Sequence, residues 1–432
     1  MTELGTGTGP KPRRLPVLLL GTGVLVIALV AGGIWWFGRG PAAPSGGGTL
    51  LHGLERQPQV SWSIPQGRDE TWAATTAGVL LVPVDPSSSQ EVRLHAWEDG
   101  AQRWAVNLES EFEGFQKVRV QENFRQGHCA LLLEAEGKQS RLVVLSTADG
   151  AVERSLTVQP GRYHEVESGA VYRLFESEEE GAVARYTSLE KFDLEWETRM
   201  ALHFGGAEVS LQERQSRLEI CLPLDWNRYA HGCQESLELT TGRPAAWLSS
   251  GNSFERFGDT VVVAEQGTGK IRGFVGNQEK WSKDLSWATL WAVQDALLVM
   301  SGEGMFRLDP RTGEEKWRSD LGESQPVVVS AGEVTILMEY LPSFRTALLD
   351  LDKGRFEFQE HDFQASGFHE LTDKGWIISI QASEQAEGVV LRALEPGRAA
   401  PVWEASFPEY FWASNAHGHL LLQGGDTLAV AR

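Results

Sequence analysis

The residues best suited to chemistry in this chain are two cysteines that flank a short polar segment. Cys221 and Cys233 lie on either side of DWNRY, and Asn227 is the midpoint between them. If an antiparallel hairpin turns at Asn227, the two thiols face each other on adjacent strands. A disulfide can form between such thiols in an oxidising compartment. The pattern leaves two interpretations open, a disulfide or a pair of buried thiols.

The other candidates for chemistry are weaker. Cys129 lies in the apolar stretch HCALLLEA, which favours a core cysteine over a nucleophile. His417 and His419 are expected on one side of a strand, and His231 is close to Cys233, but neither pair has the four-ligand spacing of a zinc site. Acidic residues are too numerous for one pair to be chosen as general acid and base. We therefore predict no catalytic residue, no metal site and no cofactor.

Acidic side chains outnumber basic ones after residue 48. The chain has 39 basic and 59 acidic side chains, and its first 48 residues hold four of the basic and one of the acidic, which leaves residues 49–432 with a net charge of −23. This balance argues against nucleic-acid binding, which depends on Lys and Arg. Two acidic clusters, Glu109, Glu111 and Glu113 and the run from Glu176 to Glu180, indicate either a docking surface for a basic protein or a solvated face.

These residues must be positioned by a domain that follows an apolar N-terminal segment. Leu15 to Phe37 form 23 residues without a charge, long enough to cross a bilayer as one helix, and Trp35 and Trp36 fall at its outer boundary. Lys11, Arg13 and Arg14 precede the segment, which predicts a cytoplasmic N-terminus. A cleaved secretory signal is the alternative. We expect a cytoplasmic tail over 1–14, a transmembrane helix over 15–37, a flexible linker over 38–54 and an external domain over 55–432, periplasmic or extracellular.

A repeated hairpin predicts the fold of the external domain. The clearest copy is MFRLDPRTGEEKWRSDL, in which Asp309, Gly313 and Trp317 mark the end of a strand, a turn and the next strand. Related copies carry Gly100 with Trp104, Gly242 with Trp247, Trp281, and Trp403. Glycine permits the tight turn, and the tryptophan is expected to pack on the neighbouring unit. Two further short strands precede each hairpin, which gives the four strands of a propeller blade.

The number of copies and the chain ends predict a closed ring. Tryptophan-type positions recur nine times from Trp62, at spacings of about 34 to 51 residues, with degenerate copies at Arg154 and Phe358. We expect an all-β propeller of about eight blades, with seven or nine as alternatives. The C-terminal run HLLLQGGDTLAVA lacks a tryptophan strand, which QVSWSIP near the N-terminus supplies. The two chain ends are thus expected to complete one blade together.

The unit RLDPRTGEEKW resembles the repeat of the pyrroloquinoline-quinone-type β-propellers. That superfamily includes quinoprotein dehydrogenases and the noncatalytic propeller lipoprotein of the outer-membrane β-barrel assembly machinery. The chain lacks the adjacent Cys-Cys pair of many such dehydrogenases, so the resemblance is nearer to the noncatalytic branch, although no lipoprotein cysteine is present. This resemblance implies a noncatalytic scaffold. Together with the expected membrane helix and linker, it leads us to expect a membrane-anchored propeller that binds proteins of the cell envelope. The alternatives are a ligand-binding sensor and a quinone-dependent oxidoreductase.

Overall fold

A computed structural model describes residues 50–432 with short internal gaps. The gaps are 68, 86, 88, 122–123, 126, 137–138, 177–180, 201–208, 225–226, 249–251, 266–267, 322–326, 332–333, 340–344, 362–367 and 383–387. The expected cytoplasmic tail and the expected membrane helix, with Leu15, Trp35, Trp36 and Phe37, lie outside the described residues. Within the described part of the chain, no helix is long and apolar enough to cross a membrane.

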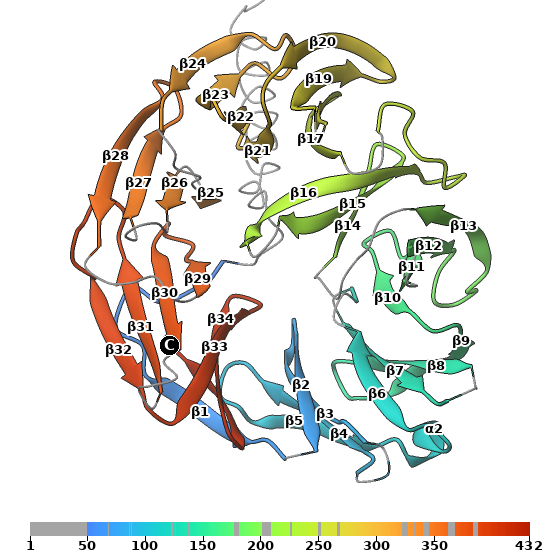
Figure 1. The fold of residues 1–432 in the computed structure, drawn as a ribbon. Helices are drawn as coiled ribbons and strands as arrows, with labels where there is room; N and C mark the ends of the chain where they lie inside the picture. The colour runs from blue at the N-terminus through green and yellow to red at the C-terminus, as the bar shows by residue number, and fades with distance from the viewer. Residues whose placement is uncertain are drawn as a thin grey trace, which may run out of the picture. The chain divides into compact units, whose positions relative to one another are not determined.

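The described residues form an all-β structure of eight antiparallel sheets, seven with four strands and one with seven. The sheets follow one another around a ring, as Figure 1 shows, so the expected β-propeller fold is confirmed. One short helix, α2 (Glu109–Phe112), interrupts the described strands and buries Phe112 under the second sheet.

Apart from the sheet that contains both chain ends, each sheet is a meander in which sequence neighbours pair. The first three sheets contain β2 (Glu70–Thr75), β3 (Gly78–Pro83), β4 (Glu91–Ala96) and β5 (Gln102–Asn107); β6 (Lys117–Gln121), β7 (His128–Glu134), β8 (Ser140–Ser146) and β9 (Val152–Val158); and β10 (Arg162–Glu165), β11 (Val171–Glu176), β12 (Gly181–Tyr186) and β13 (Leu194–Met200). Three later sheets contain β21 (Thr289–Val293), β22 (Ala296–Ser301), β23 (Gly304–Leu308) and β24 (Glu315–Ser319); β25 (Val327–Ala331), β26 (Val334–Glu339), β27 (Arg345–Asp350) and β28 (Arg355–Glu360); and β29 (Phe368–Leu371), β30 (Ile377–Ala382), β31 (Val389–Leu394) and β32 (Trp403–Phe407).

The seven-stranded sheet consists of two groups of strands. They are β14 (Ser210–Arg214), β15 (Arg217–Leu224) and β16 (Asn227–Glu238), followed by β17 (Ser253–Phe257), β18 (Thr260–Ala264), β19 (Lys270–Val275) and β20 (Gln278–Asp284). A single residue pair, Cys233 with Phe254, joins the two groups. In the first group an isolated bridge between Leu237 and Pro244 takes the place of a fourth strand.

The two ends of the chain close the ring in one sheet. This sheet contains β33 (Tyr410–Ala416), β34 (His419–Gly424), β35 (Thr427–Ala431) and β1 (Val60–Pro65). Trp62 of β1 pairs with Val430 of β35, so the expected joining of the termini is confirmed. Ring closure also removes two free sheet edges that would otherwise invite pairing with another chain.

The segment before β1 is part of the fold from Leu51 onward. Leu51 and Leu54 are 0% and 2% exposed, although both fall in the linker that the sequence predicted to be flexible. The Leu51 amide donates to the Leu371 carbonyl at 2.7 Å, and the Asp373 amide donates to the Leu51 carbonyl at 3.0 Å. Two isolated leucines gave no pattern from which this packing could be predicted.

The core lies between neighbouring sheets rather than at the centre of the ring. Inner strands such as β3, β18 and β22 are buried along their whole length because both faces meet another sheet. Outer strands such as β5 alternate between exposed and buried positions. Leu80 and Leu94 of the first sheet pack with Leu131 and Val143 of the second. This packing is typical of the contacts between neighbouring sheets, which are called joints below. Apolar burial between sheets therefore holds the ring together.

Candidate functional site

Five tryptophans on outer strands each dock on a glycine of the next sheet. A Cβ atom built on Gly313 would lie 2.6 Å from the ring of Trp281, so only glycine fits beneath the indole. Gly313 also has φ 71°, which favours glycine. The five pairs are Trp62 on Gly100, Trp104 on Gly150, Trp196 on Gly242, Trp281 on Gly313 and Trp317 on Gly354.

Each of these contacts between a tryptophan and a glycine, called a dock below, also contains a hydrogen bond at a constant position. The indole Nε1 of Trp281 donates to the Pro310 carbonyl at 2.9 Å, and that of Trp104 donates to the Thr147 carbonyl at 3.0 Å. In all five docks the acceptor stands three residues before the glycine. The repeat thus couples the tryptophan of one hairpin to the glycine of the next. The sequence predicted that the tryptophan packs on the neighbouring unit, but not that the turn glycine is its partner there.

Two other tryptophans are docked differently. The Trp403 indole donates to the carbonyl of Leu54 at 2.9 Å, so the N-terminal segment takes the place of the missing hairpin at the chain ends. Trp247 is buried and meets Phe254 edge-on at 5.1 Å between ring centres. Asp309 accepts the Arg311 and Thr312 amides at 2.9 and 3.2 Å, which shapes the turn.

At the degenerate copy Arg154 replaces the tryptophan, so no dock forms. The turn of the next sheet, which carries a glycine in the five docks, differs as well. Phe192 occupies the position of the glycine: its φ is 53°, and its amide donates to the Ser188 carbonyl at 2.8 Å, as Gly313 donates to Asp309. The Phe192 ring stacks on Tyr186 at 4.3 Å. Without an indole above it, this turn has room for a side chain.

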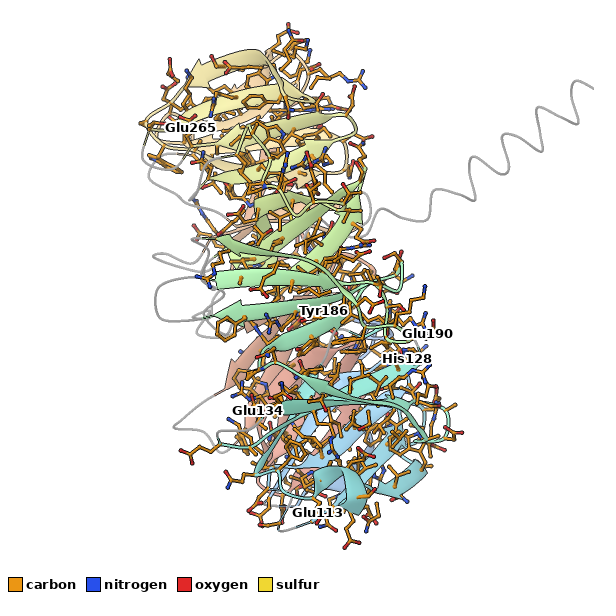
Figure 2. The ribbon with its side chains drawn as sticks, turned by 90° about the vertical axis from the view of Figure 1, so that its right-hand side faces the viewer. Glu113, His128, Glu134, Tyr186, Glu190 and Glu265 are labelled. Atoms are coloured by element: carbon orange, nitrogen blue, oxygen red, sulfur yellow. A yellow bond between two sulfur atoms is a disulfide. The ribbon has the colours of Figure 1, made fainter. Side chains whose placement is uncertain are left out.

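A polar cluster links the two sheets at that joint. His128 at the start of β7, labelled in Figure 2 with Tyr186, has Nδ1 2.9 Å from an oxygen of Glu165 and Nε2 2.9 Å from an oxygen of Glu153. Arg125 Nε lies 3.0 Å from the other oxygen of Glu165, whose side chain is 1% exposed. Polar contacts, among them the ion pair of Arg125 with Glu165, therefore link the two sheets at the joint that lacks a docked tryptophan.

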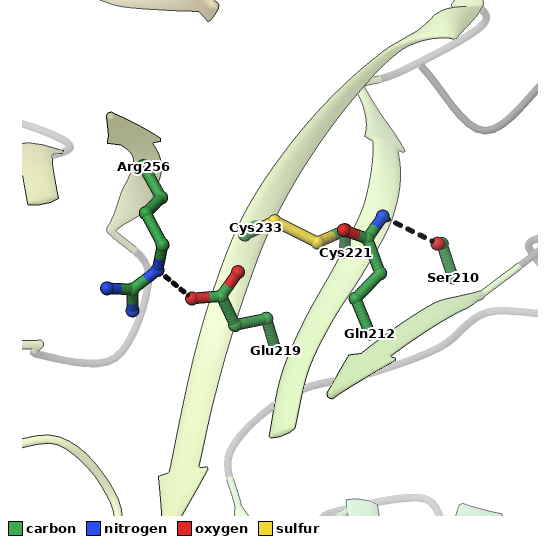
Figure 3. The surroundings of a disulfide bond; sticks show 6 residues. All are labelled: Ser210, Gln212, Glu219, Cys221, Cys233 and Arg256. Atoms are coloured by element: carbon green, nitrogen blue, oxygen red, sulfur yellow. Dashed lines mark hydrogen bonds and ion pairs between the residues drawn. A yellow bond between two sulfur atoms is a disulfide. The ribbon is translucent and has the colours of Figure 1, made fainter. Parts of the chain in front are cut away.

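The disulfide predicted as one alternative is present in the structure. Cys221 of β15 and Cys233 of β16 are direct partners in the strand register and are joined by a disulfide (Figure 3). Cys221 is 1% exposed. Next to it, Gln212 on β14 donates to the hydroxyl of Ser210 at 3.2 Å. The expected hairpin is present, but Asn227 begins β16 opposite Leu224 instead of forming the turn. A register shift between Pro223 and Leu224 then brings Cys221 opposite Cys233.

The joint beside the disulfide is polar. Arg256 of β17 donates through Nε to Glu219 of β15, and their side chains are 9% and 1% exposed. Arg256 also donates through Nη1 to Gln215 at 3.2 Å, and Arg217 donates through Nε to the Ser236 hydroxyl at 2.7 Å. The two contacts of Arg256 connect β14–β16 to β17, whereas the bond from Arg217 of β15 to Ser236 of β16 lies within the first group.

Two carboxyl groups near this joint are shifted toward the protonated form. Burial raises the pKa of Glu235, two residues after Cys233, to about 7. Burial, with the Glu219 carboxylate nearby, raises the pKa of Glu255 to about 8, against the opposing effect of Arg214. A carboxyl group that titrates near neutral pH can exchange protons. It also makes the stability of this joint depend on pH.

The weaker sequence candidates are placed away from this joint. Burial raises the pKa of Cys129 to about 12, so this residue is a core thiol. His417 lies in the turn before β34 with φ 50°, whereas His419 begins β34 and stacks on Trp97 at 4.5 Å. The expectation that both histidines lie on one strand is therefore wrong, because Gly418, with φ 83°, belongs to the turn between β33 and β34. Among the described residues, no group of three His, Cys, Asp or Glu side chains could hold a metal.

The predicted acidic clusters are placed only in part. Glu111 of α2 accepts the Ser155 hydroxyl at 2.5 Å and lies 3.4 Å from Arg141 Nη1, so it supports the helix locally. Glu109 and Glu113 are exposed, and Glu113 is labelled in Figure 2. Residues 177–180 of the second cluster lie outside the described residues.

No family model and no curated protein matches this sequence. The solved structures that resemble the chain share little sequence with it. BamB from Moraxella catarrhalis is 14% identical, with 87% of this chain and 99% of that chain covered and a TM-score of 0.40. A quinohemoprotein alcohol dehydrogenase from Pseudomonas putida HK5 is 11% identical, with 87% and 76% covered and a TM-score of 0.40.

A structure described as the eukaryotic initiation factor is 11% identical, with 84% of this chain and 90% of that chain covered and a TM-score of 0.51. At such identities the likeness concerns the fold alone. The fold itself agrees with the resemblance of the repeat, since the closed ring of sheets and the docked tryptophans are both present. The chain is thus a β-propeller, and the solved structures that it resembles include BamB and a quinohemoprotein alcohol dehydrogenase.

Proposed function

We propose that this protein is a membrane-anchored, extracytoplasmic propeller that acts as a noncatalytic, protein-binding scaffold of the cell envelope. The observation that carries the proposal is the Cys221–Cys233 disulfide within a closed ring, because disulfides persist mainly in oxidising compartments. The charge-free segment Leu15 to Phe37, preceded by basic residues, would anchor the ring on that side of the membrane. We take the blade number as about eight, supported by the eight hydrogen-bonded sheets of the described residues.

A scaffold role is supported by how the characteristic residues of the repeat are used. The docked tryptophans and glycines serve packing between sheets, which produces a rigid ring with a large outer surface. That surface is acidic in places. An open hollow of about 530 Å³ is lined by Asp295, Asp350, Asp352 and Arg307. A partner with basic side chains would complement it.

The proposal is tested by locating the ring and identifying its companions. A reporter fused after residue 432 should be active only outside the cytoplasm, and crosslinking in intact membranes should recover defined envelope proteins. A cytoplasmic reporter signal would contradict the localisation, and failure to recover any partner would contradict the scaffold role. Dye reduction with quinone and calcium over a panel of alcohols and sugars should be absent; if it occurs, the protein is an enzyme.

A ligand-binding sensor is the second candidate, and the same hollow favours it. Its volume lies within the roughly 300–1,000 Å³ of small-molecule sites. Arg307 holds one side of it by donating to the Leu351 carbonyl and to Asp352, both at 2.8 Å. A thermal-shift screen of cationic metabolites tests this function. Stabilisation that is lost in Asp350→Asn supports the sensor, and no stabilisation by any compound counts against it.

A further inference from the structure

A hollow lies where the two ends of the chain close the ring. Three loops meet there: the link from β1 to β2, the loop between β3 and β4, and the turn between β34 and β35. Its volume is about 450 Å³, within the size range of small binding sites. Its lining includes Gln66, Asp69, Glu70, Ser89, Arg93 and Asp426. It is called the closing hollow below.

The closing hollow and the described part of the N-terminal segment lie at opposite ends of the closing sheet. In this sheet, the turn between the first strand, β33, and the second, β34, is at one end of the strands, and the link that leaves β1 is at the other. The N-terminal segment contacts the first of these, because the His52 amide donates to the Gly418 carbonyl at 3.0 Å. A partner can therefore enter the hollow without displacing this segment.

Hydrogen bonds order the wall of the hollow before a partner binds. Arg93 donates through Nη2 to both carboxylate oxygens of Glu70, at 2.6 and 2.8 Å, and the Gly67 amide donates to the same carboxylate at 2.7 Å. The Gln66 amide donates to the Asp426 carbonyl at 2.9 Å, which joins the link to the turn of the closing sheet. Because these groups are already ordered, less conformational entropy is lost when a partner docks.

The hollow combines apolar walls with an excess of negative charge. Its lining is more apolar than polar. Glu70 is paired with Arg93, whereas the exposed residues Asp69 and Asp426 add two further carboxylates. Val84 is 46% exposed, and its amide donates to the Asp69 carbonyl at 2.7 Å. Lysine and arginine side chains have an apolar stem and a charged head, so they match both features of the hollow.

We propose that the closing hollow receives a lysine or arginine side chain of a partner protein. The stem of this side chain packs on the apolar walls, its charged head pairs with Asp69 and Asp426, and a neighbouring apolar residue of the partner covers Val84. Charge complementarity thus selects a basic segment as the occupant. This inference rests on the proposed scaffold function and names the surface at which that function acts.

The test places a photo-crosslinking amino acid, p-benzoylphenylalanine, at Val84 of the full-length protein in intact membranes. The control position is Val152, which begins β9 and is 41% exposed. We expect a protein adduct from position 84 and none from position 152. Mass spectrometry should locate the adduct next to a lysine or arginine of the partner. An adduct within an acidic segment of the partner would overturn the proposal, as would an adduct from position 152 alone.

Charge reversal tests the two carboxylates. In the double variant Asp69→Lys and Asp426→Lys, the adduct from position 84 should fall by about tenfold, because like charges now meet in the hollow. The matched control is Glu190→Lys with Asp259→Lys, which changes the net charge by the same amount at exposed residues of other loops. The adduct should persist in this control. An undiminished adduct in the first variant, or an equal loss in both, would overturn the pairing in the hollow.

The outcomes distinguish this proposal from the scaffold function. All four substitutions replace exposed side chains, so urea unfolding should match the parent, and a lost adduct then reports lost binding. If the membrane crosslinking experiment above recovers a partner and position 84 gives no adduct, the scaffold function stands and the closing hollow is not its site. If neither experiment recovers a partner, both proposals are overturned.

Discussion

Two kinds of joint connect neighbouring sheets in this ring. At the Trp281–Gly313 joint an indole covers a bare glycine and bonds to a carbonyl, and nothing in the dock titrates. At the joint between β14–β16 and β17, by contrast, the buried ion pair of Glu219 and Arg256 accompanies an apolar contact of Trp247 with Phe254. The first kind repeats and builds the ring, whereas the second occurs where β16 and β17 meet at the single residue pair of Cys233 and Phe254. The two kinds of joint thus differ in whether a charged pair is buried between the strands.

The largest expected effect comes from removing a docked tryptophan. Trp104 is 7% exposed and packs on Gly150, so Trp104→Ala should lower the free energy of unfolding by about 3–5 kcal/mol. Urea unfolding measures the loss. Trp287→Ala is the control, since Trp287 is 38% exposed. If both variants lost equal stability, docking would not be what distinguishes these joints.

The next prediction separates two reasons why a dock requires glycine: the lack of space beneath the indole and the positive φ of the backbone. Gly313→Ala would place a Cβ 2.6 Å from the Trp281 ring at φ 71°, whereas Gly258→Ala has φ 62° and no heavy atom within 4 Å. The control should cost about 1 kcal/mol for its backbone. Gly313→Ala should cost about 1–3 kcal/mol more, because the indole must shift. Equal losses in urea unfolding would show that the ring tolerates a wider dock.

These docks also show what the sequence could predict. Asp309, Gly313 and Trp317 recur at a spacing that identified the hairpin, the four-stranded sheet and the closure of β1 on β35. The sequence also predicted that each tryptophan packs on the neighbouring unit. It could not reveal that Trp281 covers the turn glycine Gly313 there, because strand patterns report which face is buried and not which residue covers it.

The candidate site was predictable in one respect only. The sequence predicted a hairpin with Cys221 opposite Cys233, which the register shows, although Asn227 pairs with Leu224 and a register shift, not a turn at Asn227, sets that pairing. The Glu219–Arg256 pair and the course of β16 beside β21 and β25 depend on contacts between distant segments. Charged residues are common along alternating strands, so the sequence gave no local indication of the Glu219–Arg256 pair or of the course of β16. Likewise, Leu51 and Leu54 had no periodic neighbours to mark them as core.

A smaller effect distinguishes the polar joint by its dependence on pH. Glu235 has a pKa of about 7 in the folded protein and 4.5 as an ordinary side chain, so the folded state retains a proton that the unfolded state releases between these values. Stability must therefore fall as pH rises from 4.5 to 7. The expected contribution is about 1–3 kcal/mol, because one pKa unit corresponds to about 1.4 kcal/mol.

Comparison of variants isolates this contribution from others. His164 acts in the opposite direction, since burial lowers its pKa to about 3 and stability falls as pH drops from 6.5 toward that value. The measurement is therefore the difference between parent and Glu235→Gln in urea unfolding at pH 5 and at pH 8. The variant should gain stability relative to the parent at pH 8. A difference that is constant across pH would refute the assignment to Glu235.

The smallest effect is a conversion of one kind of joint into the other. At the joint where Arg154 replaces tryptophan, Phe192 fills the place of the glycine and stacks on Tyr186. Arg154→Trp alone should clash with the Phe192 turn, and Phe192→Gly alone should lose the ring contact. The double variant should recover the dock, with the indole bonding to the Leu189 carbonyl three residues before position 192. A double-mutant cycle in urea should then give a favourable coupling of about 1 kcal/mol. Additive losses would mean that His128, Arg125 and Glu165 already fix this joint in a geometry that a tryptophan cannot enter. In that case the polar cluster does not merely replace the dock, because it prevents the dock from forming.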